Sequence, residues 1–159
     1  MRPDGLSTFV RHAATLTMLA GACCLLVSCS FPRIIVLDDP LTPEEHVNLG
    51  VAYEKSGDTD LAEQEYRKAA SKVPLAYVYL GNIYFEQGKL EDAEKFYRLA
   101  LDKDPRLVDA YNNLAWLYYT RGDNIEEARA LAEKAVALDP SRDAYRDTLE
   151  KIKALKPAD

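Results

Sequence analysis

Apolar residues recur three or four positions apart from residue 43 onward, which is the spacing of amphipathic helices. One short pattern returns three times, as LGVAY at 49–53, LGNIY at 80–84 and LAWLY at 114–118. Each copy is followed by a glycine and then by a second apolar pattern that ends in alanine and proline: Gly57, Ala69 and Pro74; Gly88, Ala100 and Pro105; Gly122, Ala135 and Pro140. This period of helix, turn and helix predicts an all-α solenoid.

A further helix is predicted over residues 141–155. Its apolar positions, Tyr145, Leu149, Ile152 and Leu155, fall on one helical face, and charged residues cover the other. A polar outer face is what a terminal cap of a solenoid requires.

The repeated positions resemble the tetratricopeptide repeat (TPR) pattern, which places Leu, a small residue and Tyr on the first helix, and Ala, an aromatic residue and Ala on the second. Repeat one matches with Leu49, Gly50, Tyr53, Ala62, Tyr66 and Ala69, repeat two with Leu80, Gly81, Tyr84, Ala93, Tyr97 and Ala100, and repeat three with Leu114, Ala115, Tyr118, Ala128 and Ala135. The resemblance implies a right-handed TPR solenoid of three helix–turn–helix repeats at 43–74, 74–105 and 108–140, together 43–140, with a capping helix and tail at 141–159.

Three departures from the pattern carry structural expectations. The interval from Gly50 to Gly81 lacks three residues, so the first helix of repeat two should be shorter, with Pro74 near its start. Repeat three has one extra residue in its turn, around Asn124. It also has Ala132 where an aromatic is usual, which predicts looser packing or a neighbour that fills the space.

By the same resemblance, the first helices line a concave groove that binds a peptide or helix of a partner protein. The positions carried over are Val47, Val51, Glu54, Lys55, Val78, Asn82, Phe85, Glu86, Asn112, Trp116, Tyr119 and Thr120. The groove is therefore expected to be apolar and aromatic, with Asn82 and Asn112 placed to bond a peptide backbone. The alternative is that the linker or the capping helix covers part of it, above all Trp116 and Tyr119.

The Lys/Asn/Arg clamp that chaperone-binding repeat domains use for a C-terminal carboxylate is absent. The matching positions hold Val47, Val51, Tyr79, Asp109 and Asn113.

The N-terminal segment 1–28 has basic residues followed by an apolar run from Ala13 to Val27, about the length of a secretory h-region. The run ends in Leu26-Val27-Ser28-Cys29, which resembles a bacterial lipobox and implies cleavage before Cys29 and its lipidation. An uncleaved anchor and a weaker box ending at Cys23 are the alternatives. Ser30 after the cysteine favours the outer membrane in a Gram-negative host, with the domain facing the periplasm.

Residues 29–42 form the lipidated cysteine and a linker whose centre, Ile34 to Leu37, is apolar. An exposed β-prone run would favour aggregation, so this stretch is expected to pack on the first repeat. The alternative is a strand donated to a partner's sheet.

Composition narrows the classes of function. Apolar residues make up 48% and charged residues 29%, as in a folded domain. The net charge of −6 argues against nucleic-acid binding. All three cysteines lie within the first 29 residues, so the repeats have no disulfide or cysteine-based metal site.

Catalytic chemistry has little support in the sequence. His46, the one histidine after the signal segment, stands at a packing position, and no nucleophile–base set or phosphate loop can be assembled around it. We predict no cofactor and no small-molecule substrate. The favoured function is a membrane-tethered adaptor or assembly factor of the bacterial cell envelope. The alternatives are a structural protein that self-associates through its ends and, last, an enzyme.

Overall fold

The computed structural model describes residues 39–155, which form one compact unit in which every element is a helix. The helices are α2 (Pro43–Ser56), α3 (Thr59–Ala69), α4 (Leu75–Glu86), α5 (Leu90–Lys103), α6 (Val108–Arg121), α7 (Ile125–Leu138) and α8 (Asp143–Lys153). The all-α class is thereby confirmed. The predicted signal peptide, Cys29 and the Ile34–Leu37 stretch lie outside the described residues.

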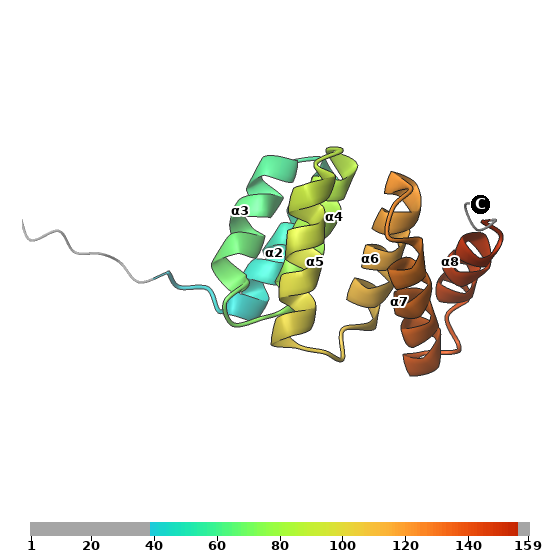
Figure 1. The fold of residues 1–159 in the computed structure, drawn as a ribbon. Coiled ribbons are helices and arrows are strands. Elements are labelled where there is room, and N and C mark those ends of the chain that lie inside the picture. Colours follow the sequence, from blue (N-terminus) through green and yellow to red (C-terminus); the bar gives the residue numbers. More distant parts are fainter. Residues whose placement is uncertain (1–38, 156–159) are drawn as a thin grey trace, which may run out of the picture. The chain divides into compact units, whose positions relative to one another are not determined.

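The helices form antiparallel pairs that stack side by side (Figure 1). Helix α2 packs with α3, α4 with α5, and α6 with α7, and successive pairs meet through α3 with α4 and α5 with α6. Helix α4 also contacts α6, and α6 contacts α8. This is the predicted solenoid of three repeats, and α8 closes its end.

The three turn glycines all adopt the left-handed conformation, with φ of 86° at Gly57, 72° at Gly88 and 78° at Gly122. Only a residue without a Cβ takes this conformation at little cost, so these glycines end the first helix of each repeat. The extra residue of repeat three, Asn124, is left-handed as well, at φ 49°. Asparagine tolerates that region better than most residues, which lets the longer turn close.

The departures in the repeats have the predicted consequences. Helix α4 has 12 residues whereas α2 and α6 have 14, and it begins directly after Pro74. Ala132 is fully buried in an apolar cluster that also contains Ala115 and Ile152 of α8, so its neighbours enclose the position that an aromatic occupies elsewhere.

Helix α2 starts with a capping box that the sequence analysis missed. The Thr42 hydroxyl accepts a hydrogen bond from the Glu45 amide at 3.2 Å, and the Glu45 carboxylate accepts one from the Thr42 amide at 2.7 Å. The Thr-x-x-Glu spacing before an apolar run is the signal that would have predicted it.

A polar contact repeats at the two junctions between repeats. Where repeat one meets repeat two, Glu63 of α3 accepts hydrogen bonds from Arg67 and from the hydroxyl of Tyr84, the latter at 2.8 Å. At the next junction Glu94 accepts the corresponding hydrogen bonds, from Arg98 at 3.0 Å and from the Tyr118 hydroxyl at 2.6 Å.

The junction with α8 is different, because Ile152 occupies the place that Tyr84 and Tyr118 hold in the earlier repeats. On α7 the order of glutamate and arginine is reversed, and Arg129 stands where α3 and α5 have Glu63 and Glu94. The Nε atom of Arg129 is buried and has no hydrogen-bond partner among the described residues. The last junction therefore depends more on apolar packing.

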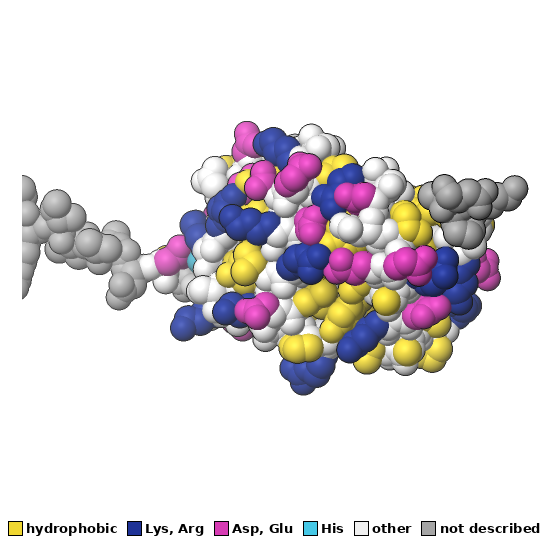
Figure 2. Space-filling view, viewed as in Figure 1, with side chains coloured by type: hydrophobic (Ala, Val, Ile, Leu, Met, Phe, Trp, Pro, Cys, Tyr) yellow, Lys and Arg dark blue, Asp and Glu magenta, His cyan; other side chains and the backbone are white. Residues whose placement is uncertain are grey.

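Figure 2 shows the side of the solenoid on which α3, α5 and α7 lie in front. Basic, acidic and apolar side chains are mixed on this side. Arg67 pairs with Glu63 along α3, and Arg98 pairs with Glu94 along α5. The arginine of each pair is exposed, so the ion pair itself contributes little to stability.

Candidate functional site

The first helices α2, α4 and α6 and the capping helix α8 supply the face on which the groove was predicted. Two of the predicted groove residues belong to the core instead, because Val47 is 8% exposed and Val78 is 2% exposed. Val47 belongs to the apolar cluster that contains Ala62 and Tyr66 of α3, and Val78 belongs to the cluster that contains Ala93 and Tyr97 of α5. Burial leaves these two valines little surface for a partner, which corrects the sequence prediction.

The other predicted positions are at least partly exposed: Val51, Glu54, Lys55, Asn82, Phe85, Glu86, Asn112, Trp116, Tyr119 and Thr120. The structure brings four of them, Asn82, Phe85, Glu86 and Trp116, to one pocket of about 140 Å³, the α4–α6 pocket. Tyr97 and Asn113 complete its lining.

Asn82 lies at the centre of a hydrogen-bond network within this pocket. Its side-chain oxygen accepts a hydrogen bond from the Tyr97 hydroxyl at 2.9 Å and another from the Asn113 amide at 2.9 Å. The network joins α4, α5 and α6 and so couples repeat two to repeat three. The oxygen of Asn82 is thus occupied internally, and only its NH₂ group remains for the peptide bonding that the sequence predicted.

Trp116 and Asn113 also line a second pocket of about 270 Å³, the α6–α8 pocket. Asn112, Asn113 and Trp116 line its α6 side, and Ala144, Asp147, Thr148 and Lys151 line its α8 side. Sequence reasoning missed the α8 residues because it treated this helix only as a cap.

The Trp116 ring is already in contact with its neighbours. It stacks on Tyr119 with ring centroids 5.0 Å apart, and the Lys151 ammonium lies 4.8 Å from its centroid. Part of the alternative drawn from sequence is therefore correct, since the capping helix does contact Trp116. The indole still lines both pockets.

Val51 and Glu54 of α2 line neither pocket. The Glu54 carboxylate accepts a hydrogen bond from the Tyr66 hydroxyl, which ties it to the packing of repeat one. Val51 packs against the apolar cluster of repeats one and two.

The α4–α6 pocket contains one carboxylate, that of Glu86. Burial, together with the negative charge of Glu86, raises the pKa of Tyr97, so its hydroxyl stays protonated and donates to Asn82. Glu86 is exposed and takes part in no ion pair among residues 39–155.

The positions of the absent carboxylate clamp have other partners. Tyr79 stacks on Tyr66 with centroids 4.9 Å apart. Asp109 accepts hydrogen bonds from the Tyr145 hydroxyl at 2.6 Å and from Arg142 at 3.0 Å. This side of the groove has no clamp for a terminal carboxylate.

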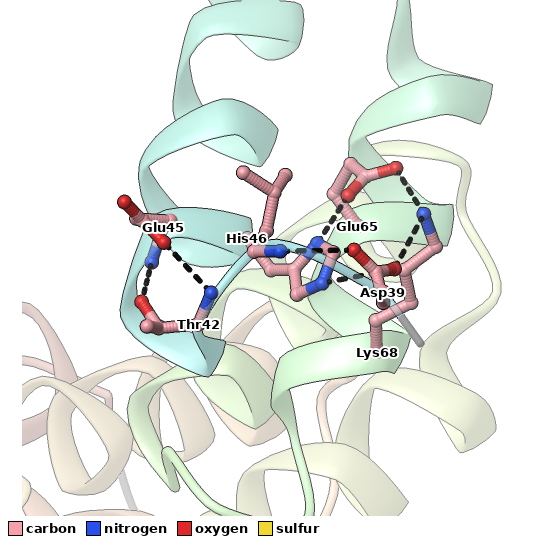
Figure 3. A network of polar contacts seen from close by, with 7 residues as sticks. Asp39, Thr42, Glu45, His46, Glu65 and Lys68 are labelled. Carbon is pink, nitrogen blue, oxygen red and sulfur yellow. Dashed lines mark hydrogen bonds and ion pairs between the residues drawn. The ribbon is translucent and has the colours of Figure 1, made fainter. Parts of the chain in front are cut away.

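His46 belongs to a separate polar network at the start of α2 (Figure 3). Its ring is buried, with Nδ1 2.6 Å from the Glu65 carboxylate and Nε2 3.3 Å from that of Asp39. Lys68 pairs with Glu65 at 2.8 Å. Burial would raise the pKa of Glu65, but hydrogen bonds from Lys68 and His46 hold it below its usual value. These contacts join the start of α2 to α3 through the buried His46 ring.

Two further findings concern the part of the chain that the structure describes. It contains no group of three or more histidine, cysteine or acidic residues arranged to hold a metal ion. None of its helices has both the length and the apolar character needed to cross a bilayer.

The fold defines a class, the α-helical solenoids built from antiparallel helix pairs. Within that class, two tetratricopeptide repeat family profiles match the chain, one over residues 47–108 and the other over 84–152. The protein belongs to the tetratricopeptide repeat family. A search of curated protein sequences gave no match.

Solved structures with this fold include the first TPR of Spaghetti (RPAP3) bound to an HSP90 peptide, which is 24% identical with a TM-score of 0.65 and covers 72% of this chain and 93% of that one. The second TPR domain of human RPAP3, in complex with an HSP70 peptide, is 21% identical with a TM-score of 0.62, over 72% of this chain and 100% of that one. Pseudomonas aeruginosa pilF is 22% identical with a TM-score of 0.62, over 72% of this chain and 53% of that one. At these identities the likeness shows the fold.

Proposed function

We propose that this protein is a membrane-tethered TPR lipoprotein that serves as an adaptor or assembly factor in the bacterial cell envelope, and that it holds a peptide or helix of a partner against α4, α6 and α8. The observation that carries the proposal is the pair of pockets that share Trp116. Concave sites with aromatic walls and a few placed polar groups are typical of ligand recognition.

The solved relatives support the coarser part of the proposal. The titles of two of them describe TPR domains with bound HSP90 and HSP70 peptides, so the fold accommodates peptides. The clamp positions hold no cation here, so the partner should not be a C-terminal carboxylate of that kind.

Trp116 and Phe85 supply the aromatic area of the groove. Large aromatic side chains often dominate the energetics of a binding surface, because they bury much apolar area at a low entropic cost. The double substitution Trp116→Ala with Phe85→Ala should therefore abolish partner capture while the helical content is retained.

A crosslinking pull-down from the native envelope tests the groove with the full-length lipoprotein. The matched control is Leu61→Ala, which removes an exposed apolar side chain from α3, outside both pockets. We expect the control to capture the same partners as the native protein. Unchanged capture by the folded double variant would rule out binding on this face.

The anchor is tested independently of the groove. Cys29→Ser should release the protein from membranes, because stable attachment depends on the acyl chains. Cys23→Ser is the control and should leave the protein membrane-bound. Persistent attachment of the Cys29 variant would indicate an uncleaved anchor, and release by the Cys23 variant would indicate the other lipobox.

A further inference from the structure

The residues that line the α4–α6 pocket favour a positively charged ligand. Phe85 and Trp116 present aromatic rings, and Glu86 presents a carboxylate with no ion-pair partner among the described residues. Asn82 and Asn113 add amide groups between them. An aromatic wall beside a carboxylate attracts a cation twice, through the ring quadrupole and through direct charge attraction.

The protein itself shows that the Trp116 ring accepts a cation. The Lys151 ammonium lies 4.8 Å from the ring centroid, within the range of a cation–π contact. This contact comes from α8, on the side of the second pocket. Phe85, Tyr97 and Trp116 give the α4–α6 pocket aromatic walls, and none of its six lining residues is basic.

The α6–α8 pocket beyond Trp116 carries both signs of charge, with Asp147 as its one carboxylate and Lys151 as its one cation. Its lysine already contacts the indole. The preference for a cation from the partner therefore belongs to the α4–α6 pocket.

From these observations we infer that the groove recognises a basic segment of its partner, with one lysine or arginine side chain seated between Phe85, Trp116 and Glu86. This inference rests on the proposed function and specifies the chemistry of the partner. The occupant has the opposite charge to the carboxylate-terminated peptides that a cationic clamp binds.

The size of the pocket agrees with this occupant. A volume of about 140 Å³ is enough for one long side chain and too small for a helix or an aromatic cluster. Charge complementarity should also speed the encounter of a basic segment with a chain whose net charge is −6. Binding should therefore weaken as salt is added.

The experiment uses Trp116 as its reporter, because it is the only tryptophan of the chain. The full-length protein is titrated with acetyl-Gly-Arg-Gly-amide, and the indole N–H signal is followed by NMR. The matched probe contains citrulline in place of arginine, which has nearly the same shape but no charge. A leucine tripeptide serves as the apolar probe.

We expect the arginine tripeptide to shift the Trp116 signal with a Kd on the order of 1 mM, as is reasonable for a single side chain. The citrulline and leucine probes should bind at least about tenfold more weakly. Glu86→Gln should weaken arginine binding about threefold to tenfold and leave citrulline binding unchanged. Glu150→Gln, which removes an exposed charge from α8 outside both pockets, should have no effect.

The inference is overturned if the leucine probe binds as tightly as the arginine probe, if Glu86→Gln has no effect, or if the arginine probe gives no shift up to about 10 mM. These results are distinguishable from failure of the proposed function. Tight binding of the leucine probe would leave a groove of apolar preference. Loss of the function would instead be seen as unchanged partner capture by the Trp116 and Phe85 double variant.

Discussion

Gly81 of α4 lies so close to the ring of Tyr97 on α5 that a Cβ atom built on the glycine would stand 2.4 Å from Cε1. Gly50 stands in the same relation to Tyr66 in repeat one, again at 2.4 Å. The hydrogen atom of glycine is therefore what allows the tyrosine ring to lie flat against the first helix.

In repeat three, alanines occupy both positions of this contact. Ala115 replaces the glycine and Ala132 replaces the tyrosine, and both are fully buried. Without the ring there is room for a methyl group, so the two changes compensate each other. Ala132 is therefore not a packing defect, because Ala115 compensates for the missing ring.

The first prediction follows from this contact. Gly81→Ala should lower the free energy of unfolding by about 2 kcal/mol, because the added methyl group forces the fully packed Tyr97 ring to move. Urea denaturation monitored by circular dichroism measures the effect. Tyr97→Ala should cost less in the Gly81→Ala background than in the native protein, since the ring then no longer opposes the methyl group. Strict additivity of the two substitutions would contradict this account.

The contact between repeats two and three gives the second prediction. Tyr118→Phe removes the hydroxyl group that donates a hydrogen bond to Glu94 at 2.6 Å. It should lower the free energy of unfolding by about 1–2 kcal/mol, because the half-buried carboxylate loses a charge-assisted hydrogen bond. The neighbouring Tyr119→Phe is the control, because the Tyr119 hydroxyl has no hydrogen bond among the described residues. Equal unfolding midpoints of the two variants would show that this bond adds nothing.

Glu65 makes the stability depend on pH. Its pKa is lower in the folded protein than its usual value, because Lys68 and His46 hydrogen-bond the charged form and outweigh the effect of burial. A lowered folded pKa contributes stability above the unfolded pKa of about 4.3, and this contribution is lost as the pH falls through the folded value.

Glu65→Gln should therefore destabilise the protein most at neutral pH and progressively less below about pH 4. Urea midpoints of the native and variant proteins at neutral and acidic pH test this. The control is Glu44→Gln on the exposed surface of α2, for which the difference should stay small at both pH values. A difference for Glu65→Gln that grows on acidification would contradict the assignment.

The fourth prediction separates two asparagines that the sequence treats alike. Asn82→Ala should lower the free energy of unfolding by about 1–2 kcal/mol, because Tyr97 and Asn113 both lose the acceptor they share. Asn112→Ala should change the free energy of unfolding by less than about 0.5 kcal/mol, since its oxygen has no partner among the described residues and its NH₂ group makes only a long hydrogen bond to Asn113, at 3.4 Å. Thermal unfolding of both variants provides the comparison, and a larger loss for Asn112→Ala would refute it.

Much of the fold could be predicted from sequence because the residues at the turns and helix starts of the repeats are distinctive. Gly57, Gly88 and Gly122 stand where the chain must turn through a left-handed conformation, which few other residues tolerate. Pro74 has no backbone N–H and marks the start of α4. Such signals are local and depend on the residue type alone.

The site was less predictable, because position in a repeat does not determine exposure. Val78 and Asn82 are both first-helix positions of one repeat, yet the valine is buried against α5 while the asparagine lines a pocket. The part played by α8 could not be foreseen either. Its residues meet Trp116 only after the last pair has stacked, so no local pattern records the contact.

By itself the sequence determined the helical period, the three repeats and their turns, because these follow from side-chain spacing and backbone freedom within about 34 residues. It also carries the lipobox-like segment on which the membrane proposal rests. The tertiary structure decided which groove residues face solvent, how Asn82 and Glu94 connect neighbouring repeats, and where the pockets lie beside Trp116. Those features depend on contacts between residues distant along the chain, and such contacts exist only once the helices have packed.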